Sequence, residues 1–190
     1  GGGAISNTGT IKSITGNFKG NTTDKDGGAI SNSKDREINF VAENNKDIRF
    51  EGNYVTSNTG KGGAIYNAGG IVGLYAETGR SITFVGGENV KNSKYDIDGI
   101  FNVGILNING SYEGTTYTGT VNLYNVSDYS TLMGTTNIYG GTVNSNGNFS
   151  QKELNIDNAE MKVNGVLDVS LIYLNNSAIL GFGEKGGEQK

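Results

Sequence analysis

A hexapeptide that recurs along the first half of the chain constrains the fold more than any other feature. It reads Gly-Gly-Ala-Ile-Ser-Asn or Gly-Gly-Ala-Ile-Tyr-Asn, and its copies occupy residues 2–7, 27–32 and 62–67. Ile100 and Asn102 keep its isoleucine and asparagine 35 residues after the third copy (100 − 65). Repetition at this period is typical of a solenoid, in which each repeat forms one coil that stacks on the next.

A second signature follows each copy of the first. It reads Phe-x-x-Asn at Phe18–Asn21 and at Phe50–Asn53, and it is altered to Phe-x-x-Gly at Phe84–Gly87. Residues 40–50 also align without gaps on residues 74–84. In both segments apolar residues occupy alternate positions, which places them on one face of a β-strand. We therefore predict an all-β, right-handed parallel β-helix with three short strands per coil and no substantial helix.

A second pattern begins near Gly104, where apolar, polar and apolar residues recur in triplets. The second apolar residue of each triplet is Ile108, Leu123, Ile138, Ile156 or Leu174, so the steps are 15 or 18 residues. Such a step suits a coil of short strands with tight turns and is too short for a strand–helix–strand unit. We expect two outward columns of stacked amides, one made of Asn107, Asn122, Asn137 and Asn155 and the other of Asn7, Asn32, Asn67 and Asn102.

These patterns predict a continuous β-helix with three parts. Residues 1–96 form coils of the two signatures, residues 97–180 form short-period coils of the same helix, and residues 181–190, which are rich in glycine and charge, form a flexible tail. We predict stacked columns of apolar residues inside the coils, at Ile5, Ile30, Phe50, Ile65, Phe84, Ile108, Leu123, Ile138, Ile156 and Leu174.

Composition narrows the possible functions. The 190 residues include no cysteine and no histidine, so a disulfide framework, a thiolate site, the usual zinc ligand and the usual general base are all missing. The net charge of −4, without a basic cluster, argues against a nucleic-acid partner. No apolar run reaches the ~20 residues of a membrane span. We expect no cofactor, and because the sequence opens inside a repeat we expect a fragment of a longer secreted protein.

The two signatures together resemble the repeats of the chlamydial polymorphic outer-membrane proteins, which belong to the autotransporters. Residues 119–123 and 137–143 are similar to the C-terminal part of autotransporter passengers in general. The Phe-x-x-Gly segment departs from the family signature, and the family's C-terminal membrane barrel is not in this sequence. The resemblance implies secretion through an outer-membrane pore, attachment to the membrane only through that barrel, and display on the cell surface for adhesion to host cells or sister bacteria.

Three functions follow for such a fold. We favour an adhesin segment that binds a host-cell protein or glycan, and the alternatives are a passive stalk and a polysaccharide-degrading enzyme. An enzyme of that class needs carboxylates that converge in one groove, whereas the acidic residues here are scattered. Outward aromatic residues often anchor interfaces, so Tyr124 and Tyr139, which are expected at equivalent positions one coil apart, are the candidate binding residues. The alternative is that these two tyrosines only stack on each other across the sheet.

Two further hypotheses concern metal and assembly. Asp24 with Asp26, and Asp96 with Asp98, place paired carboxylates before a glycine, which allows a calcium site. Turns in which these side chains bond to the backbone are the alternative. The ends of a parallel coil also present unpaired backbone groups, so we expect copies of the chain to associate end to end.

Overall fold

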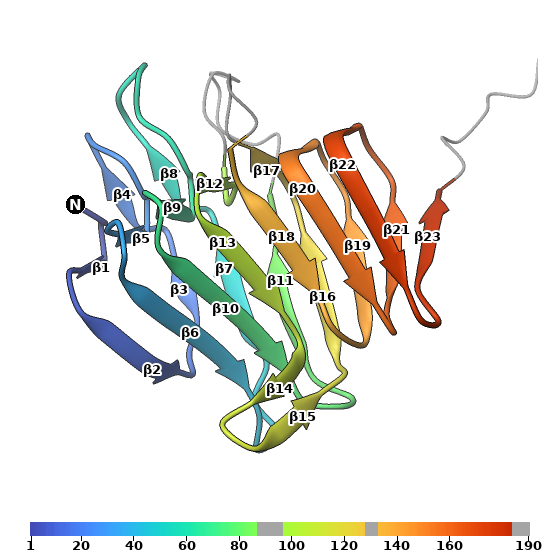
Figure 1. The fold of residues 1–190 in the computed structure, drawn as a ribbon. Coiled ribbons are helices and arrows are strands. Elements are labelled where there is room, and N and C mark those ends of the chain that lie inside the picture. The colour runs from blue at the N-terminus through green and yellow to red at the C-terminus, as the bar shows by residue number, and fades with distance from the viewer. Residues whose placement is uncertain (87–96, 128–132, 184–190) are drawn as a thin grey trace, which may run out of the picture.

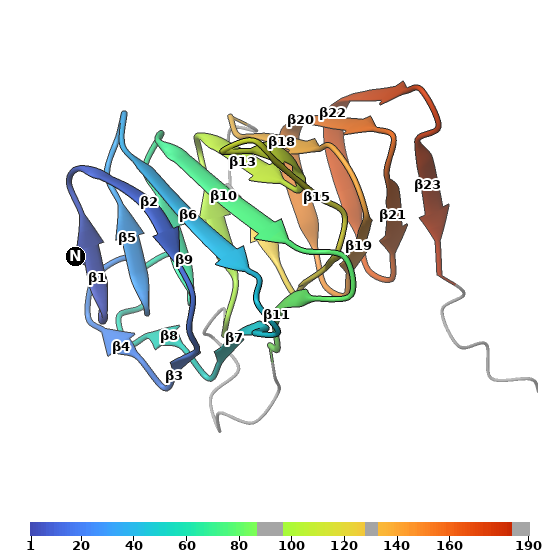
Figure 2. The same cartoon turned by 90° about the horizontal axis from the view of Figure 1, so that it is seen from below.

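The computed structural model describes residues 1–86, 97–127 and 133–183, and within these ranges it contains only strands and their connections. Figure 1 shows the strands stacked side by side from the N-terminal end to the C-terminal end, and Figure 2 shows the sheets facing one another. All the described strand pairs are parallel except one antiparallel hairpin. The chain is therefore an all-β, parallel solenoid, as its repeats predict. No described segment forms a helix able to cross a membrane.

The largest sheet has two arms that share its two longest strands. Its first arm consists of β1 (Ile5–Asn7), β5 (Ile30–Asn32), β9 (Ile65–Asn67), β12 (Ile100–Asn102) and β17 (Val126–Ser127). Its second arm consists of β2 (Thr10–Ile14), β6 (Glu37–Ala42), β10 (Ile71–Ala76), β13 (Ile105–Ile108) and β18 (Thr135–Ile138). The strands β20 (Phe149–Asp157) and β22 (Leu167–Asn175) run along both arms.

A second large sheet closes the coils from the opposite side. It consists of β3 (Phe18–Lys19), β7 (Ile48–Glu51), β11 (Ser81–Phe84), β16 (Thr120–Leu123), β19 (Thr142–Ser145), β21 (Glu160–Val163) and β23 (Ile179–Phe182). Two small pairs complete the described strands, namely β4 (Thr22–Thr23) with β8 (Tyr54–Val55) and β14 (Gly110–Tyr112) with β15 (Thr115–Tyr117). The predicted tail would begin at Gly181, inside β23, whereas residues 184–190 lie outside the described part of the chain.

Register confirms the repeat alignment. Ile30 pairs with Ile5 on one side and with Ile65 on the other, and Ile65 pairs with Ile100. Phe40 pairs with Leu74, as the gap-free alignment of the two segments requires. The sequence period in this half of the chain is therefore the length of one coil.

The core fills the space between the sheets with columns of apolar side chains. Phe18, Phe50 and Phe84 stack face to face, with ring centroids 4.8 and 4.4 Å apart. Eight of the predicted interior residues are buried, namely Ile30, Phe50, Ile65, Phe84, Ile108, Leu123, Ile138 and Ile156. Ile5 is only partly buried and Leu174 is 50% exposed. The prediction is wrong for Leu174 because, among the described strands, β22 pairs on one side only, with β20.

The number of strands per coil varies along the solenoid. The coil that begins at β5 carries four strands, whereas each of the last two described coils carries two. Gly9, Gly70 and Gly104 lie at corners between the two arms in three earlier coils, and an added Cβ at Gly104 would lie 2.1 Å from the Gly70 carbonyl oxygen. The corner between β5 and β6 has no glycine and turns with Asp35 at a φ of 58°. The corresponding stretch of β20, residues 150–152, has no glycine. There the backbone continues as one nine-residue strand.

The predicted single column of outward asparagines is wrong, because its members lie on two sheets. Asn107, Asn137 and Asn155 share one register on the second arm, and their amides form a hydrogen-bonded row. Asn122 lies on the other large sheet, where it accepts a hydrogen bond from Asn144. The first 15-residue step, from Ile108 to Leu123, therefore connects the two sheets within one coil, and the second, from Leu123 to Ile138, leads back to the first sheet in the next coil. The repeat between the last coils is 18 residues, as the Asn137–Asn155 pair shows.

The hairpin β14–β15 interrupts the solenoid between β13 and β16. It lies over the ends of β6 and β10 (Figure 1). The Tyr112 ring stacks on Tyr75 at a centroid distance of 4.3 Å, and its hydroxyl donates to the Lys12 carbonyl oxygen over 2.5 Å. Tyr75 and Val41, which face away from the main core, become buried together with Tyr117. The hairpin thus gives this face a small apolar cluster of its own.

Candidate functional site

The asparagine of the first signature forms a row of amides at the corner between the two arms of the large sheet. The side-chain nitrogens of Asn7, Asn32 and Asn67 each donate to the side-chain oxygen of the next asparagine, over 2.8, 2.9 and 2.7 Å. Asn102 ends the row by donating to Gln151 over 2.7 Å. The expected hydrogen-bonded column is therefore confirmed.

These amides point into the corner and are buried, so the expected outward orientation is wrong. The chain turns sharply after each asparagine, which leaves backbone groups without a partner in the sheet. Asn67 supplies that partner, because its amide nitrogen donates to the Gly70 carbonyl and its oxygen accepts from the Gly70 N–H. The first signature is thus a structural device that satisfies the corner in the coils that carry its asparagine.

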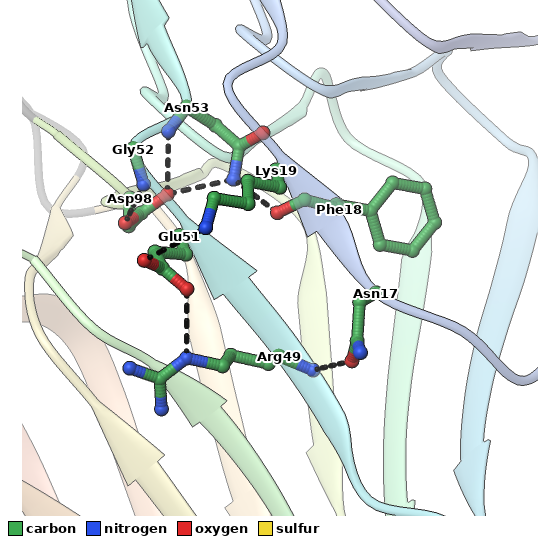
Figure 3. A network of polar contacts seen from close by, with 8 residues as sticks. All are labelled: Asn17, Phe18, Lys19, Arg49, Glu51, Gly52, Asn53 and Asp98. Atoms are coloured by element: carbon green, nitrogen blue, oxygen red, sulfur yellow. Dashed lines mark hydrogen bonds and ion pairs between the residues drawn. The ribbon is translucent and has the colours of Figure 1, made fainter.

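The asparagine of the second signature forms another such row, which ends on a carboxylate (Figure 3). Asn53 accepts from the backbone and side-chain nitrogens of Asn21 over 3.0 and 2.8 Å. Its own backbone and side-chain nitrogens donate to Oδ1 of Asp98 over 2.8 and 2.7 Å, while the Gly52 N–H donates to Oδ2 over 2.7 Å. Asp98 therefore acts as the last member of this row.

Asp98 is fully buried, and burial raises the pKa of its carboxyl group, although the N–H groups of Asn53 and Gly52 oppose that shift. Its oxygens are engaged by these donors. Asp26 accepts from the backbone N–H of Lys61 over 3.0 Å, and Asp24 is exposed. Asp26 and Asp98 therefore accept hydrogen bonds from backbone groups of a neighbouring coil and not from their own turns. Asp96 lies outside the described residues. Within the described ranges no group of His, Cys, Asp or Glu is arranged to hold a metal ion.

The polar network in Figure 3 continues onto the surface, where charged side chains connect β3 and β7. Glu51 forms ion pairs with Arg49 over 3.0 Å and with Lys19 over 3.4 Å. Hydrogen bonds from Arg49 and then Lys19 lower the pKa of Glu51. These groups are exposed and form a solvated surface row, which is a weak basis for a binding site.

A depression of about 670 Å³ lies where the hairpin meets the second arm, and it is open to solvent. Its lining comes from the hairpin, from the residue after β18 and from the turns after β20 and β22. The lining residues are Gly110, Ser111, Thr116, Tyr139, Asp157, Asn158 and Asn176. We refer to this set as the hairpin groove.

Tyr139 is the largest residue of the hairpin groove, and 46% of its surface is exposed. It stands beside Gly110, where an added Cβ would lie 2.5 Å from the Tyr139 Cβ. Asn176 of the following coil donates to Oδ1 of Asp157, and this hydrogen bond fixes the carboxylate at the end of β20. The groove therefore joins an exposed ring, a fixed carboxylate and several neutral polar groups.

Tyr124, the other predicted binding residue, does not belong to this groove. It follows β16 on the second large sheet and is partly buried against the core. Its ring lies against Gly86, where an added Cβ would be 2.2 Å from the ring carbon Cγ. The expected equivalence of Tyr124 and Tyr139 is wrong because it relied on the 15-residue step. Their roles in binding stay predictions.

Sequence reasoning missed the other groove residues, although a signal for the hairpin was present. Glu113 and Gly114 both adopt positive φ, at 46° and 80°, which is the geometry of a tight hairpin turn. The alternating stretch that follows, Thr115–Tyr117, reads as a strand. Asp157, Asn158 and Asn176 carried no such signal, because corner residues of a solenoid are commonly Asn or Asp.

Comparisons of the chain with protein-family models, with curated proteins and with solved structures gave no match. The chemistry of the hairpin groove is therefore argued from its own residues. Of its described lining residues only Asp157 carries a carboxyl group, whereas the usual glycosidase mechanism requires two. The arrangement is suited to hold a ligand through contacts with a ring and with hydrogen-bonding groups.

Proposed function

We propose that this chain is a binding segment of a surface-displayed adhesin, an autotransporter passenger whose strands wind into a right-handed parallel β-helix. The hairpin groove carries the proposal. The two repeated signatures build coil corners, whereas the exposed Tyr139 ring beside the hairpin lines the groove. Exposed tyrosines are among the residues that most often anchor interfaces.

Several properties favour binding over catalysis. Asp98 and Glu51 are the described carboxyl groups with displaced pKa values. Asp98 accepts hydrogen bonds from Asn53 of a neighbouring coil, and Glu51 forms an ion pair with Lys19 of a neighbouring coil. Paired carboxylates of a polysaccharide-degrading enzyme have to face a common substrate groove. The hairpin groove offers only Asp157 for that purpose. We propose attachment outside the cell, to host cells or to sister bacteria, as the role of the chain.

Attachment of the purified, fluorescently labelled chain to host epithelial cells and to bacterial cells tests this proposal. We expect saturable binding that falls at least about tenfold for Tyr139→Ser. Tyr173→Ser is the matched control, because Tyr173 is 48% exposed and does not line the groove. Absence of saturable binding to cells or matrix would favour a passive stalk, and equal losses for both variants would remove the groove from the proposal.

We also propose that copies of the chain associate end to end, and the two ends of the solenoid support this second role. Phe182 is 67% exposed. It lies on β23, at the C-terminal edge of the sheet whose N-terminal edge is β3 with Phe18. Ile172 and Leu174 are exposed on the same end, in register with the buried Leu154 and Ile156. At the opposite end Ile5, Ile11 and Ile14 are only partly buried. Stacking the C-terminal end of one copy on the N-terminal end of another would cover the apolar side chains of both ends.

Two variants distinguish this arrangement from unspecific aggregation. Ala4→Glu places a charge on the N-terminal end and Phe182→Glu places one on the C-terminal end. We expect either variant alone to sediment as a monomer, whereas an equimolar mixture gives a one-to-one dimer through the two unchanged ends. A native chain that stays monomeric at all concentrations, or a mixture without dimers, would contradict end-to-end stacking.

A further inference from the structure

The hairpin groove presents an aromatic platform surrounded by groups that both donate and accept hydrogen bonds. The Tyr139 ring is nearly half exposed, so one side of it is available to a flat apolar partner. Ser111 and Thr116 contribute hydroxyl groups, and Asn158 and Asn176 contribute amides. Hydroxyl and amide groups can each donate and accept. A ligand that suits this lining has an apolar face with hydroxyl groups around its rim.

The structure fixes these groups before a ligand arrives. Ser111 and Thr116 are directly paired across the hairpin, and the neighbouring Tyr112 is fastened to Tyr75 and to the Lys12 carbonyl oxygen. On the opposite wall Asn158 and Asn176 occupy left-handed corners, with φ of 50° and 52°. A lining that is held in place loses little conformational entropy on binding.

Charge selects among ligands that have this shape. Asp157 is the only charged residue in the described lining, and its Oδ1 accepts a hydrogen bond from Asn176. A carboxylate accepts hydrogen bonds but cannot donate them. It therefore suits a hydroxyl or amide N–H and repels a ligand carboxylate or sulfate. The net charge of −4 on the chain acts in the same direction.

We propose that the hairpin groove binds a neutral glycan. The apolar face of one sugar ring stacks on Tyr139, its hydroxyl groups donate to Asp157, and further hydroxyls bond to the amides of Asn158 and Asn176. This inference rests on the proposed adhesive function, because it names the ligand class of the same groove. The depression is open to solvent, so it accommodates a segment within a longer saccharide as well as a chain end.

Titration of the 190-residue chain with defined oligosaccharides, followed by saturation-transfer NMR and calorimetry, tests the ligand class. The neutral probes are oligomers of glucose, galactose, mannose and N-acetylglucosamine, and the acidic probes are sialyllactose and heparin-derived tetrasaccharide. We expect a neutral probe to bind, and Tyr139→Ala to weaken it about tenfold or more. Tyr139→Phe keeps the ring and should stay within about twofold of the native chain, as should the control Tyr173→Ala.

Three results would overturn the inference. They are binding of no neutral probe, tighter binding of the acidic probes, and neutral binding that Tyr139→Ala leaves unchanged. Cell attachment separates this inference from the proposed function. Attachment that depends on Tyr139 but survives enzymatic removal of neutral glycans would leave the adhesive function standing and contradict the ligand class. Neutral-glycan binding without cell attachment would support the ligand class and contradict the adhesive function.

Discussion

At the scale of single residues, buried amides decide how the coils stack. An asparagine side chain has the same hydrogen-bonding groups as a peptide unit, so a row of asparagines continues the sheet through a corner where the backbone turns away. Asn32, Asn67 and Asn102 are fully buried and form such a row. A buried polar group that loses its partner costs ~1–3 kcal/mol. The asparagine of the first signature is therefore a stability requirement.

Removing one amide from this row tests the requirement. Asn67→Ala deletes the acceptor of Asn32, the donor to Asn102 and both bonds to Gly70. We expect the free energy of unfolding to fall by about 2–4 kcal/mol, measured by urea denaturation. The control is Asn164→Ala, because Asn164 bonds to Asn146 on the exposed surface. A loss there of the same size would show that burial does not determine the cost.

The carboxyl group of Asp98 makes stability depend on pH. Because burial raises its folded-state pKa above the ordinary 3.8, the folded chain holds this proton at pH values where the unfolded chain has released it. The protonated Asp98 therefore contributes to the free energy of unfolding. This contribution is complete below pH 3.8 and is lost as the pH rises through the folded-state pKa. We expect the free energy of unfolding of the native chain, minus that of Asp98→Asn, to decrease from pH 3 to pH 7. Denaturation curves of both proteins measure this difference, and an increase would mean that the N–H donors outweigh burial.

At the scale of elements, the hairpin β14–β15 is the main departure from a plain solenoid. It carries Tyr112 and Tyr117 to the outer face, where they bury Tyr75 and Val41. Burial of the Tyr75 phenol raises its pKa to about 12. Asn39 beneath the hairpin donates to the Tyr112 hydroxyl over 3.0 Å. Tyr112 therefore contributes both apolar contact and two hydrogen bonds to the position of the hairpin.

Tyr112→Ala should release the hairpin while leaving the sheets intact. It removes the stack on Tyr75 and the bonds to Asn39 and to the Lys12 carbonyl oxygen. We expect faster amide hydrogen exchange in residues 110–117, with a stability loss of about 1–3 kcal/mol, by mass spectrometry and denaturation. Tyr112→Phe keeps the stack and should give a smaller increase. Unchanged exchange in both variants would mean that β13 and β16 hold the hairpin without this anchor.

At the scale of the whole molecule, each coil is stabilised by its neighbours, so the same interior position differs in cost along the stack. Ile138 is buried between Ile108 and Ile156, whereas Leu174 occupies the same column in a coil that has a neighbour on one side only within residues 1–86, 97–127 and 133–183. A carboxylate at the first position would lie in an apolar interior, and one at the second would reach water.

Replacing both positions by aspartate measures this difference. Ile138→Asp should cost about 4 kcal/mol or more and prevent cooperative folding of the middle coils, because an unpaired carboxylate would be buried. Leu174→Asp should cost about 2 kcal/mol or less. Thermal unfolding followed by circular dichroism compares the variants. Equal losses would contradict a stack stabilised by nearest neighbours.

The sequence by itself determined the architecture of the first half. Parallel strands at a constant period place equivalent residues on top of one another, so the isoleucines at 5, 30, 65 and 100 and the stacked phenylalanines could be predicted from spacing alone. Of the candidate site, only Tyr139 was predicted. Its surroundings were not, because they come from a hairpin and from corners of later coils.

Only the tertiary structure decided which triplets share a sheet, which way the asparagines face and what covers Tyr75. Leu123 and Ile138 lie in similar triplets, but a coil of variable strand number places them on different sheets. Alternation along a strand gives the side on which a residue lies, but it does not tell whether a corner or a hairpin buries that side. These outcomes depend on contacts between residues far apart in the sequence, such as Tyr112 with Lys12, which no local pattern records.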